Sequence, residues 1–351
     1  MTNIHKSVQN YYGQELSKSE DLKTNACCTL VQPPKHIVNA MNNIHDEVMS
    51  KYYGCGLTIP NQVKNLTILD LGSGSGRDVY IAAQLVGEHG TVVGVDMTQE
   101  QLDVANKYIE HHREKFGYQA SNVSFIKGNI DDLSNIDIEK ESIDIIISNC
   151  VINLVENKAK VLADAFDLLK PGGEMYFSDV YCNRRIPQYL QDNQVLWGEC
   201  LSGAMYWNDF LRAAKNAGFT DPRTMESHPI TIENRDLEET VGALKFYSVT
   251  YRLWKIDGLE SDCEDFGQAV SYKGSIDYNP NIFELDDHHV FEKGNIMSVC
   301  GNTYKMLHET RFKAHFDFYG TWDTHYGIFE GCGRAMPFGD SITSDEGGSC
   351  C

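Results

Sequence analysis

Three cysteines could do chemistry, and the glycines around two of them, Cys55 and Cys200, leave the thiol poorly shielded. Cys55 lies between two glycines in "YYGCGL", Cys150 follows an apolar run in "DIIISNCVINL", and Cys200 lies in the glycine-interrupted aromatic segment "LWGECL". Taken alone, Cys150 fits a small buried hydrophobic residue equally well, since free cysteine often takes that role. Exposed thiolates, however, bind soft metals and metalloids. The cysteines therefore raise the question of what lies beside them.

A glycine-rich turn and an acid form a second chemical pattern. In "LDLGSGSGRD", a strand leads through Asp70 into Gly72, Gly74 and Gly76, and a helix follows. Glycines at this place let the backbone approach a ligand at the end of the first strand. The glycines alone would also fit a tight structural turn. Twenty residues after Gly76, however, Asp96 ends the next strand in "VVGVDMT", where an acid can accept hydrogen bonds from ribose hydroxyls. Together the two features predict a nucleoside site.

The glycine spacing indicates which nucleoside binds. A dinucleotide site spaces its glycines G-x-G-x-x-G to seat a pyrophosphate, whereas this turn has G-x-G-x-G behind an acid that would repel one. With "KGNIDD" and "KPGG", the pattern over about residues 66–180 resembles the class I S-adenosylmethionine-dependent methyltransferases. A dehydrogenase is the alternative. The resemblance implies S-adenosylmethionine as methyl donor, no stable metal cofactor, and these donor-binding residues: Asp70, Gly72, Gly74, Asp96, Met97, Gly128, Asn129, Ile130, Asp131 and Asn149.

The elements that must position these residues follow an alternating pattern. Five short apolar strands, most of them separated by helices such as 99–116 and 156–169, predict a Rossmann-like α/β fold with a doubly wound, mostly parallel sheet. Residues 224–232 and 244–256 are expected to add antiparallel strands. The segment before the sheet predicts one amphipathic helix that starts after Pro34 and ends at Gly54. We expect an N-terminal helical arm over 1–57, a methyltransferase domain over 58–257, and a small β-rich C-terminal domain with a flexible tail over 258–351.

Composition narrows the function classes. The 351 residues carry 50 acids and 30 bases, a formal charge of −20, which disfavours nucleic acid and anionic membranes as partners. "MTNIHKSVQN" lacks the apolar run of a signal peptide, and no stretch approaches the ~20 apolar residues of a membrane-spanning helix. We therefore expect a cytoplasmic protein. Eleven cysteines without a Cys-x-x-Cys pair predict neither a disulfide framework nor a structural zinc site.

The expected fold suggests where the thiols lie. Cys150 ends the fourth strand, at the sheet edge where the donor methyl is expected, and the loops carrying Cys55 and Cys200 can fold over the same edge. Zinc or copper has no obvious use beside a methyl donor. Trivalent arsenic binds three thiolates in a pyramid and keeps a lone pair that can attack a sulfonium methyl. We therefore favour trivalent arsenic as the bound species.

Six motifs support a particular family. "TNACCT", "YYGCGL", "LDLGSGSGRD", "SNCVINL", "SDVY" and "LWGECL" resemble the arsenite methyltransferase family over about residues 21–257, and "VSYKGSI" and "HHVFEKGNIMSV" extend the likeness more loosely. The resemblance implies four functional cysteines, Cys27, Cys55, Cys150 and Cys200, with Cys27 preferred to Cys28 because it follows "TNA" directly. The remaining cysteines are expected to pack or to lie in an inert tail: Cys182, Cys263, Cys300, Cys332, Cys350 and Cys351.

The family resemblance implies a complete reaction. Arsenite and methylarsenite, as glutathione conjugates, would be methylated to methyl- and dimethylarsenicals, which is arsenic detoxification. Cys150 and Cys200 would bind the arsenic in every cycle, with Cys55 as third ligand and residues 181–257 as the arsenic-binding segment. Cys27 would close a disulfide with Cys55, which thioredoxin or glutathione reduces. The alternatives are a methyltransferase for an organic small molecule and a non-enzymatic thiol protein that sequesters arsenite.

Overall fold

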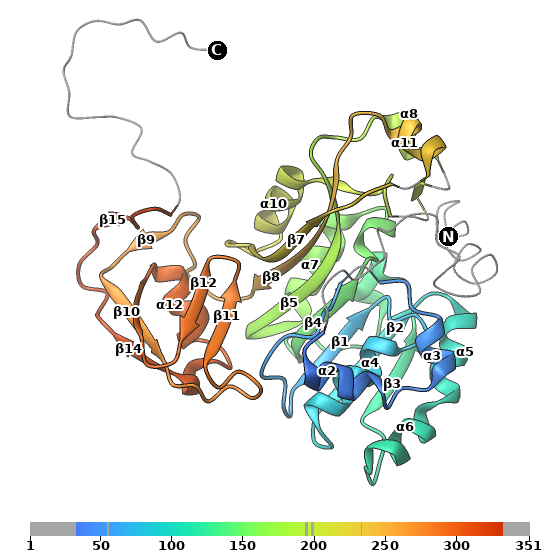
Figure 1. Ribbon diagram of the computed structural model, residues 1–351, viewed down its shortest axis with the longest axis horizontal. Helices are drawn as coiled ribbons and strands as arrows, with labels where there is room; N and C mark the ends of the chain where they lie inside the picture. Colours follow the sequence, from blue (N-terminus) through green and yellow to red (C-terminus); the bar gives the residue numbers. More distant parts are fainter. Residues whose placement is uncertain (1–32, 55, 194–195, 198–199, 233, 333–351) are drawn as a thin grey trace, which may run out of the picture.

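The protein is built around a large mixed sheet (Figure 1). The structure, a computed structural model, describes residues 33–332 except 55, 194–195, 198–199 and 233. The strands run in the order β3-β2-β1-β4-β5-β8-β7, and β6 pairs with β5. Their bounds are β1 (Thr67–Leu71), β2 (Thr91–Asp96), β3 (Val123–Lys127), β4 (Ile143–Asn149), β5 (Leu169–Cys182), β6 (Met205–Tyr206), β7 (Arg223–Pro229) and β8 (Phe246–Trp254). The first five strands are parallel and β8 is antiparallel to β5 and β7, which confirms the predicted sheet.

Side-chain alternation along β4 explains why helices cover both faces. Ile146 packs into one apolar cluster, whereas Ile145 and Ile147 pack into the cluster on the opposite face. The helices that cover the two faces are α2 (Lys35–Met41), α3 (Asp46–Ser50), α4 (Arg77–Val86) and α5 (Gln99–Lys107) on one, and α7 (Lys158–Leu168) and α10 (Trp207–Asn216) on the other. No helix in the described part of the chain is long and apolar enough to cross a membrane.

Two helices predicted as continuous are interrupted. The helix expected from Pro34 to Gly54 is two helices, α2 and α3, because the His45 ring nitrogen accepts a hydrogen bond from the N–H of Glu47 at 3.1 Å and so caps a new helix. The helix expected over 99–116 breaks at Tyr108 into α5 and α6 (Ile109–Phe116). Tyr108 leaves helical geometry and stacks on His45 at 3.8 Å between ring centroids. The first correction comes from a local cap, and the second from a contact between segments far apart in the sequence.

The C-terminal region adds small antiparallel sheets beside the large one. β10 lies between β13 and β14, β11 pairs with β12, and β15 pairs with β9. These strands enclose an apolar cluster of their own, which α12 joins. The bounds are β9 (Glu264–Asp265), β10 (Gln268–Tyr272), β11 (Ile282–Asp286), β12 (His289–Glu292), β13 (Ile296–Val299), α12 (Gly301–His308), β14 (Phe316–Tyr319) and β15 (Gly327–Ile328). The expected β-rich character is confirmed, and the domain boundaries stay a prediction.

A buried ion cluster joins this region to the large sheet. Glu174 of β5 is fully buried and accepts from the Arg252 guanidinium of β8 at 2.9 Å. It also pairs with Arg311, which follows α12. Burial by itself raises the pKa of Glu174, but the two guanidinium groups more than offset this and lower it. Arg252 further donates to the carbonyl of Leu285 in β11 at 2.9 Å. One carboxylate therefore holds two cations from different parts of the chain.

Candidate active site

The first strand ends in the glycine turn that the sequence singles out. Gly72, Gly74 and Gly76 have φ angles of 77°, 51° and 90°, in the left-handed region that glycine adopts without strain. The N–H of Gly72 donates to the carbonyl of Val95 at 2.8 Å, which holds the turn against β2. A Cβ at Gly74 would meet no atom within 4 Å. At Gly74 the turn therefore presents its backbone to open space, whereas Gly72 and Gly76 pack against Val151 and Phe125.

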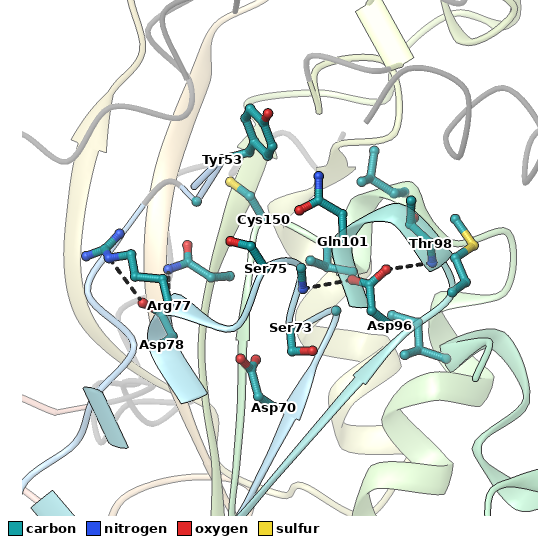
Figure 2. A pocket seen from close by; sticks show the side chains of 18 of the residues that line it. Tyr53, Asp70, Ser73, Ser75, Arg77, Asp78, Asp96, Thr98, Gln101 and Cys150 are labelled. Carbon is teal, nitrogen blue, oxygen red and sulfur yellow. Dashed lines mark hydrogen bonds and ion pairs between the residues drawn. The ribbon is translucent and has the colours of Figure 1, made fainter. Parts of the chain in front are cut away.

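That space is a cavity at the carboxyl ends of β1, β2 and β4. It encloses about 950 Å³, part of it open to solvent, which suits a small-molecule site. Cys150 lies at its edge beside Tyr53 (Figure 2). Its lining also includes the ten residues predicted to bind the donor: Asp70, Gly72, Gly74, Asp96, Met97, Gly128, Asn129, Ile130, Asp131 and Asn149. The fold thus brings these residues to one edge of the sheet, and their binding roles stay predictions.

Asp96 ends β2 with its carboxylate oriented by the backbone. One oxygen accepts from the N–H of Gly74 at 2.9 Å and the other from the N–H of Thr98 at 2.8 Å (Figure 2). Burial raises the pKa of Asp96, and these hydrogen bonds only partly counter the rise. A carboxylate has about four acceptor positions, so acceptor capacity remains for a ligand hydroxyl. The geometry suits a ribose with two adjacent hydroxyls.

Asp70 shows which charge the cavity favours. Its side chain is only 3% exposed and, among the described residues, has no hydrogen-bond partner. Burial raises the pKa of Asp70 well above its usual range, and the carboxylates of Asp78 and Asp96 raise it further. A cationic ligand would relieve both costs. The ammonium and sulfonium groups of S-adenosylmethionine supply such charges, so the residues present fit this donor.

Asn149, the last residue of β4, anchors the segment before β1 at the same edge. Its Nδ2 lies 2.8 Å from the hydroxyl of Tyr52 and 2.8 Å from the carbonyl of Gly56, and its Oδ1 accepts from the N–H of Gly56 at 3.1 Å. A Cβ at Gly54 would lie 2.6 Å from Asn149 Cγ. The glycines on both sides of residue 55 therefore pack at the sheet edge. Cys55 itself lies outside the described residues.

Cys150 and Cys200 meet beside the cavity although they are 50 positions apart. The thiol of Cys200 donates to the carbonyl of Cys150 at 3.3 Å, and the two residues are 0% and 2% exposed. Their φ angles are 60° and 56°, in the left-handed region. This conformation costs a residue other than glycine about 1–2 kcal/mol, and such strain is concentrated at functional sites. Of the four predicted cysteines these two are described and adjacent, Cys200 as a free thiol and Cys150 in a disulfide. Cys27, like Cys55, lies outside the described residues.

A half-buried lysine near Trp197 has no signal in the sequence. Lys158, at the start of α7, lies with Nζ 5.5 Å from the centroid of the Trp197 ring. Burial lowers the pKa of Lys158, while attraction to Asp179 and to Cys200 acts in the opposite direction. Burial raises the pKa of Asp179 to about 7, although it accepts from the N–H of Asn153 at 2.9 Å. The "SDVY" motif contains Asp179, but no local pattern marks Lys158.

Fold and site together define a class of protein. The protein has a doubly wound sheet, a G-x-G-x-G turn after β1, an acid at the end of β2 and a cation-favouring cavity between the turn and the acid. This combination defines a class I S-adenosylmethionine-dependent methyltransferase. In agreement, a family model described as a methyltransferase domain matches residues 62–218, and one described as the arsenite methyltransferase C-terminal domain matches residues 267–335.

Whole-chain comparisons specify the family. The chain is 52% identical to the arsenite methyltransferase of Aquipseudomonas alcaligenes over 348 residues, 99% of this chain and 100% of the relative. It is 48% identical to that of Homo sapiens over 316 residues, 89% of this chain and 83% of the relative. The crystal structure of an arsenic (III) S-adenosylmethionine methyltransferase from Chlamydomonas reinhardtii superposes with a TM-score of 0.83 at 48% identity, covering 85% of this chain and 100% of that one. The chain belongs to the arsenite methyltransferase family, which confirms the predicted resemblance.

Proposed function

We propose that this protein transfers methyl groups from S-adenosylmethionine to trivalent arsenic bound by its own thiolates. The observation that carries the proposal is the position of Cys150. This residue lines the cavity that fits the donor, and the Cys200 thiol contacts its carbonyl. A methyltransferase for an organic acceptor has no use for two buried cysteines at this place. Cys150 is disulfide-bonded in the structure, so a reductant must release its thiolate before arsenic binds. Soft thiolate ligands are what trivalent arsenic requires.

The donor is held by the glycine turn and the strand ends. When bound, S-adenosylmethionine supplies an electrophilic sulfonium methyl group. The assigned residues are Asp70, Gly72 and Gly74 for its amino-acid end, Asp96 for the ribose, and Met97 and residues 128–131 for the adenine, with Asn149 beside them. The buried carboxylate of Asp70, which has no hydrogen-bond partner in the described part of the chain, supports the first assignment, because it needs a cation nearby. The spare acceptor positions of Asp96 support the second.

Cys150 and Cys200 bind the arsenic in every cycle, and Cys55 is the third ligand for inorganic arsenite. Arsenic bound to three sulfurs keeps a lone pair, which attacks the donor methyl in line. An As–C bond forms, the donor S–C bond breaks with its electron pair left on the donor sulfur, and arsenic becomes pentavalent. The protein contributes mainly positioning and exclusion of water. The burial of Cys150 and Cys200 supports this role.

Lys158 acts as a positioning residue for this thiol pair. Burial lowers the pKa of Lys158, and attraction to Asp179, Asp131 and Cys200 favours its charged form. Lys158 lies 5.5 Å from the centroid of the Trp197 ring, which packs in the same apolar cluster as Cys200. A cation at this place favours a thiolate, the form that binds arsenic.

Two protein thiolates then return an electron pair to arsenic. They close a disulfide, for which Cys27 and Cys55 are the candidates, and the product leaves as trivalent methylarsenic. An external reductant, thioredoxin or glutathione, reopens the disulfide by thiol–disulfide exchange. Arsenite arrives as its glutathione conjugate, and the reaction takes place in the cytoplasm, where such thiols are abundant. The methylarsenical product can enter a second cycle, because it needs only two protein ligands.

One incubation tests the proposal. The protein is given arsenite, methyl-labelled donor and a thiol reductant, and the arsenic species are separated and counted. We expect labelled methyl- and dimethylarsenicals, with donor consumption that requires arsenite. Donor consumption that is independent of arsenite would indicate an organic acceptor instead. Bound arsenite without any donor consumption would indicate a sequestering protein.

A further inference from the structure

Three cysteines that this reaction does not use meet in the C-terminal region. Cys263 precedes β9, Cys300 precedes α12, Cys332 follows β15, and all three are free. Cys300 is buried, and the other two are half-buried. The Cys300 and Cys332 side chains, together with burial, raise the pKa of the Cys263 thiol. The sequence predicts each as a packing residue, but the fold brings the three thiols together.

Backbone contacts hold two of the cysteines in place independently of their sulfurs. β15 pairs with β9, and just beyond this ladder the carbonyl of Cys263 accepts from the N–H of Phe329 at 2.7 Å. The N–H of Cys332 donates to the carbonyl of Phe329 at 3.1 Å. Phe329 therefore links both residues within one turn. The third cysteine, Cys300, is brought to the same place by α12, which packs against β9.

Cys300 lies beside a buried cation. Its sulfur is 3.9 Å from Arg223 Nη2 and 3.4 Å from the hydroxyl of Thr303. The hydrogen bond from Cys263 lowers the pKa of the Cys300 thiol, Arg223 lowers it further, and the same contact raises the pKa of Cys263. Arg223 is itself held by Asp286 at 3.0 Å. Within the cluster, Cys300 therefore favours the thiolate and Cys263 keeps its proton.

We propose that Cys263, Cys300 and Cys332 form a second binding site for trivalent arsenic, separate from the site of methyl transfer. Arsenous acid exchanges its three hydroxyl groups for the three sulfurs. Three As–S bonds form, three As–O bonds break, and the three hydroxyl groups leave as water, each taking a proton from a thiol or, where the sulfur is already a thiolate, from solvent. No electron is transferred. None of the three cysteines lines the donor cavity, so arsenic bound here is held rather than methylated.

Coordination chemistry favours a metalloid over a resident metal ion at this place. In the described part of the chain, no group of three or more histidine, cysteine or acidic side chains is already arranged around a metal position. Zinc normally takes four tetrahedral ligands. His289 cannot readily be the fourth, since its Nδ1 lies 2.7 Å from Asp286 and its Nε2 lies 3.3 Å from the Thr303 hydroxyl. Trivalent arsenic needs only three sulfurs and draws them together through covalent bonds.

Arsenic stoichiometry on the full chain tests this second site. The starting protein carries Cys150→Ser and Cys200→Ser, so the result does not depend on the proposed transfer reaction. It is reduced, loaded with arsenite, separated from free arsenic and analysed for bound arsenic. Adding Cys263→Ser and Cys300→Ser should remove one equivalent per chain. The matched control, Cys182→Ser, removes a buried free cysteine outside the cluster and should remove none. An unchanged stoichiometry in the first variant overturns the proposal.

A second measurement guards against loss of folding in these variants. Unsubstituted protein is treated with phenylarsine oxide, which bridges two thiols, and its peptides are mapped. A bridge between Cys263 and Cys300, or between either and Cys332, supports the site, and three freely alkylated cysteines overturn it. A parallel loading with Zn²⁺ checks the ligand. Loss of one zinc equivalent with the same substitutions overturns the choice of arsenic.

Discussion

Two regions of this molecule gather thiols in contrasting surroundings. At the edge of the large sheet, Cys150 and Cys200 have left-handed backbones within an apolar cluster beside a donor cavity. In the C-terminal region, Cys300 has an ordinary extended backbone, with φ −68° and ψ 163°, and lies beside the Arg223 guanidinium. Cys150 and Cys200 have strained backbones at a place where a ligand must be positioned. Cys300 has an unstrained backbone, and the charge of Arg223 favours its thiolate. A cluster of thiols by itself therefore predicts arsenic binding, whereas methyl transfer also requires a donor site next to the thiols.

The largest effect is expected from substitutions that remove a ligand at the sheet edge. Cys150→Ser or Cys200→Ser should abolish methylation of both arsenite and methylarsenite, because serine offers a hard oxygen where a soft sulfur is needed. Loss of an outer-shell partner alone costs about 10- to 100-fold, so loss of a direct ligand should exceed ~100-fold. Rates with each substrate measure this. Cys182→Ser, which changes a buried cysteine of the same apolar cluster, should stay active. If Cys150→Ser methylates either substrate at a normal rate, the contrast between the two regions is wrong.

The next largest effect concerns the ion cluster that joins the two regions. Glu174→Gln leaves the buried guanidinium groups of Arg252 and Arg311 without their counter-charge, which should lower the free energy of unfolding by about 3–5 kcal/mol. Denaturant titration measures it. The control Glu239→Gln breaks an exposed pair with Arg235 and should cost less than ~1 kcal/mol. An equal, small effect in both variants would show that the two regions do not depend on this cluster.

The same carboxylate predicts a pH dependence. The pKa of Glu174 is lower in the folded chain than the ~4.3 of an unfolded glutamate. Its contribution to stability is therefore fully present above that unfolded value and is lost as the pH falls through the folded pKa. Wild-type protein should lose more stability than Glu174→Gln between neutral pH and about pH 3. Parallel losses in both proteins would contradict the assignment.

A smaller effect separates donor binding from thiol binding. Asp96→Ala removes charge-assisted hydrogen bonds worth about 1.5–3 kcal/mol, which corresponds to roughly ten- to a hundredfold weaker donor binding. Arsenite binding should change little, because the thiols are untouched. Calorimetry with each ligand measures both quantities, and Asp103→Ala, an exposed acid on α5, serves as the charge-matched control. Equal donor affinity in the two variants would remove Asp96 from the site.

The smallest effect is expected in the C-terminal region. Cys300→Ser should change the rate of methylation less than about twofold at saturating arsenite, since this residue does not line the donor cavity. It should still lose the second equivalent of bound arsenic. Steady-state rates and arsenic stoichiometry on one preparation measure both. A large loss of rate in a folded Cys300→Ser protein would mean that the second site takes part in transfer.

Much of the donor site could be predicted from the sequence, because its determinants are local. These determinants lie within short stretches of sequence that can be recognised without a structure. They are the glycines that need positive φ, the acid at the end of β2 and the apolar strands. The same holds for the parallel order of β1 to β5, since short crossovers leave few alternatives. Helix ends were less predictable. The break at His45 depends on an unusual cap by a histidine ring, and the break at Tyr108 on a ring contact with the distant His45.

Which thiols meet was decided by tertiary structure. The sequence indicated Cys150 and Cys200 through motifs, but only the fold shows the Cys200 thiol against the Cys150 carbonyl. Lys158 near Cys200, and Cys263 against Cys300, have no sequence signal at all, because each partner comes from a separate element. Local composition determines which conformations and side chains a segment offers. Charge and thiol chemistry depend on distances of a few ångströms between segments, and those distances exist only once the sheets have packed.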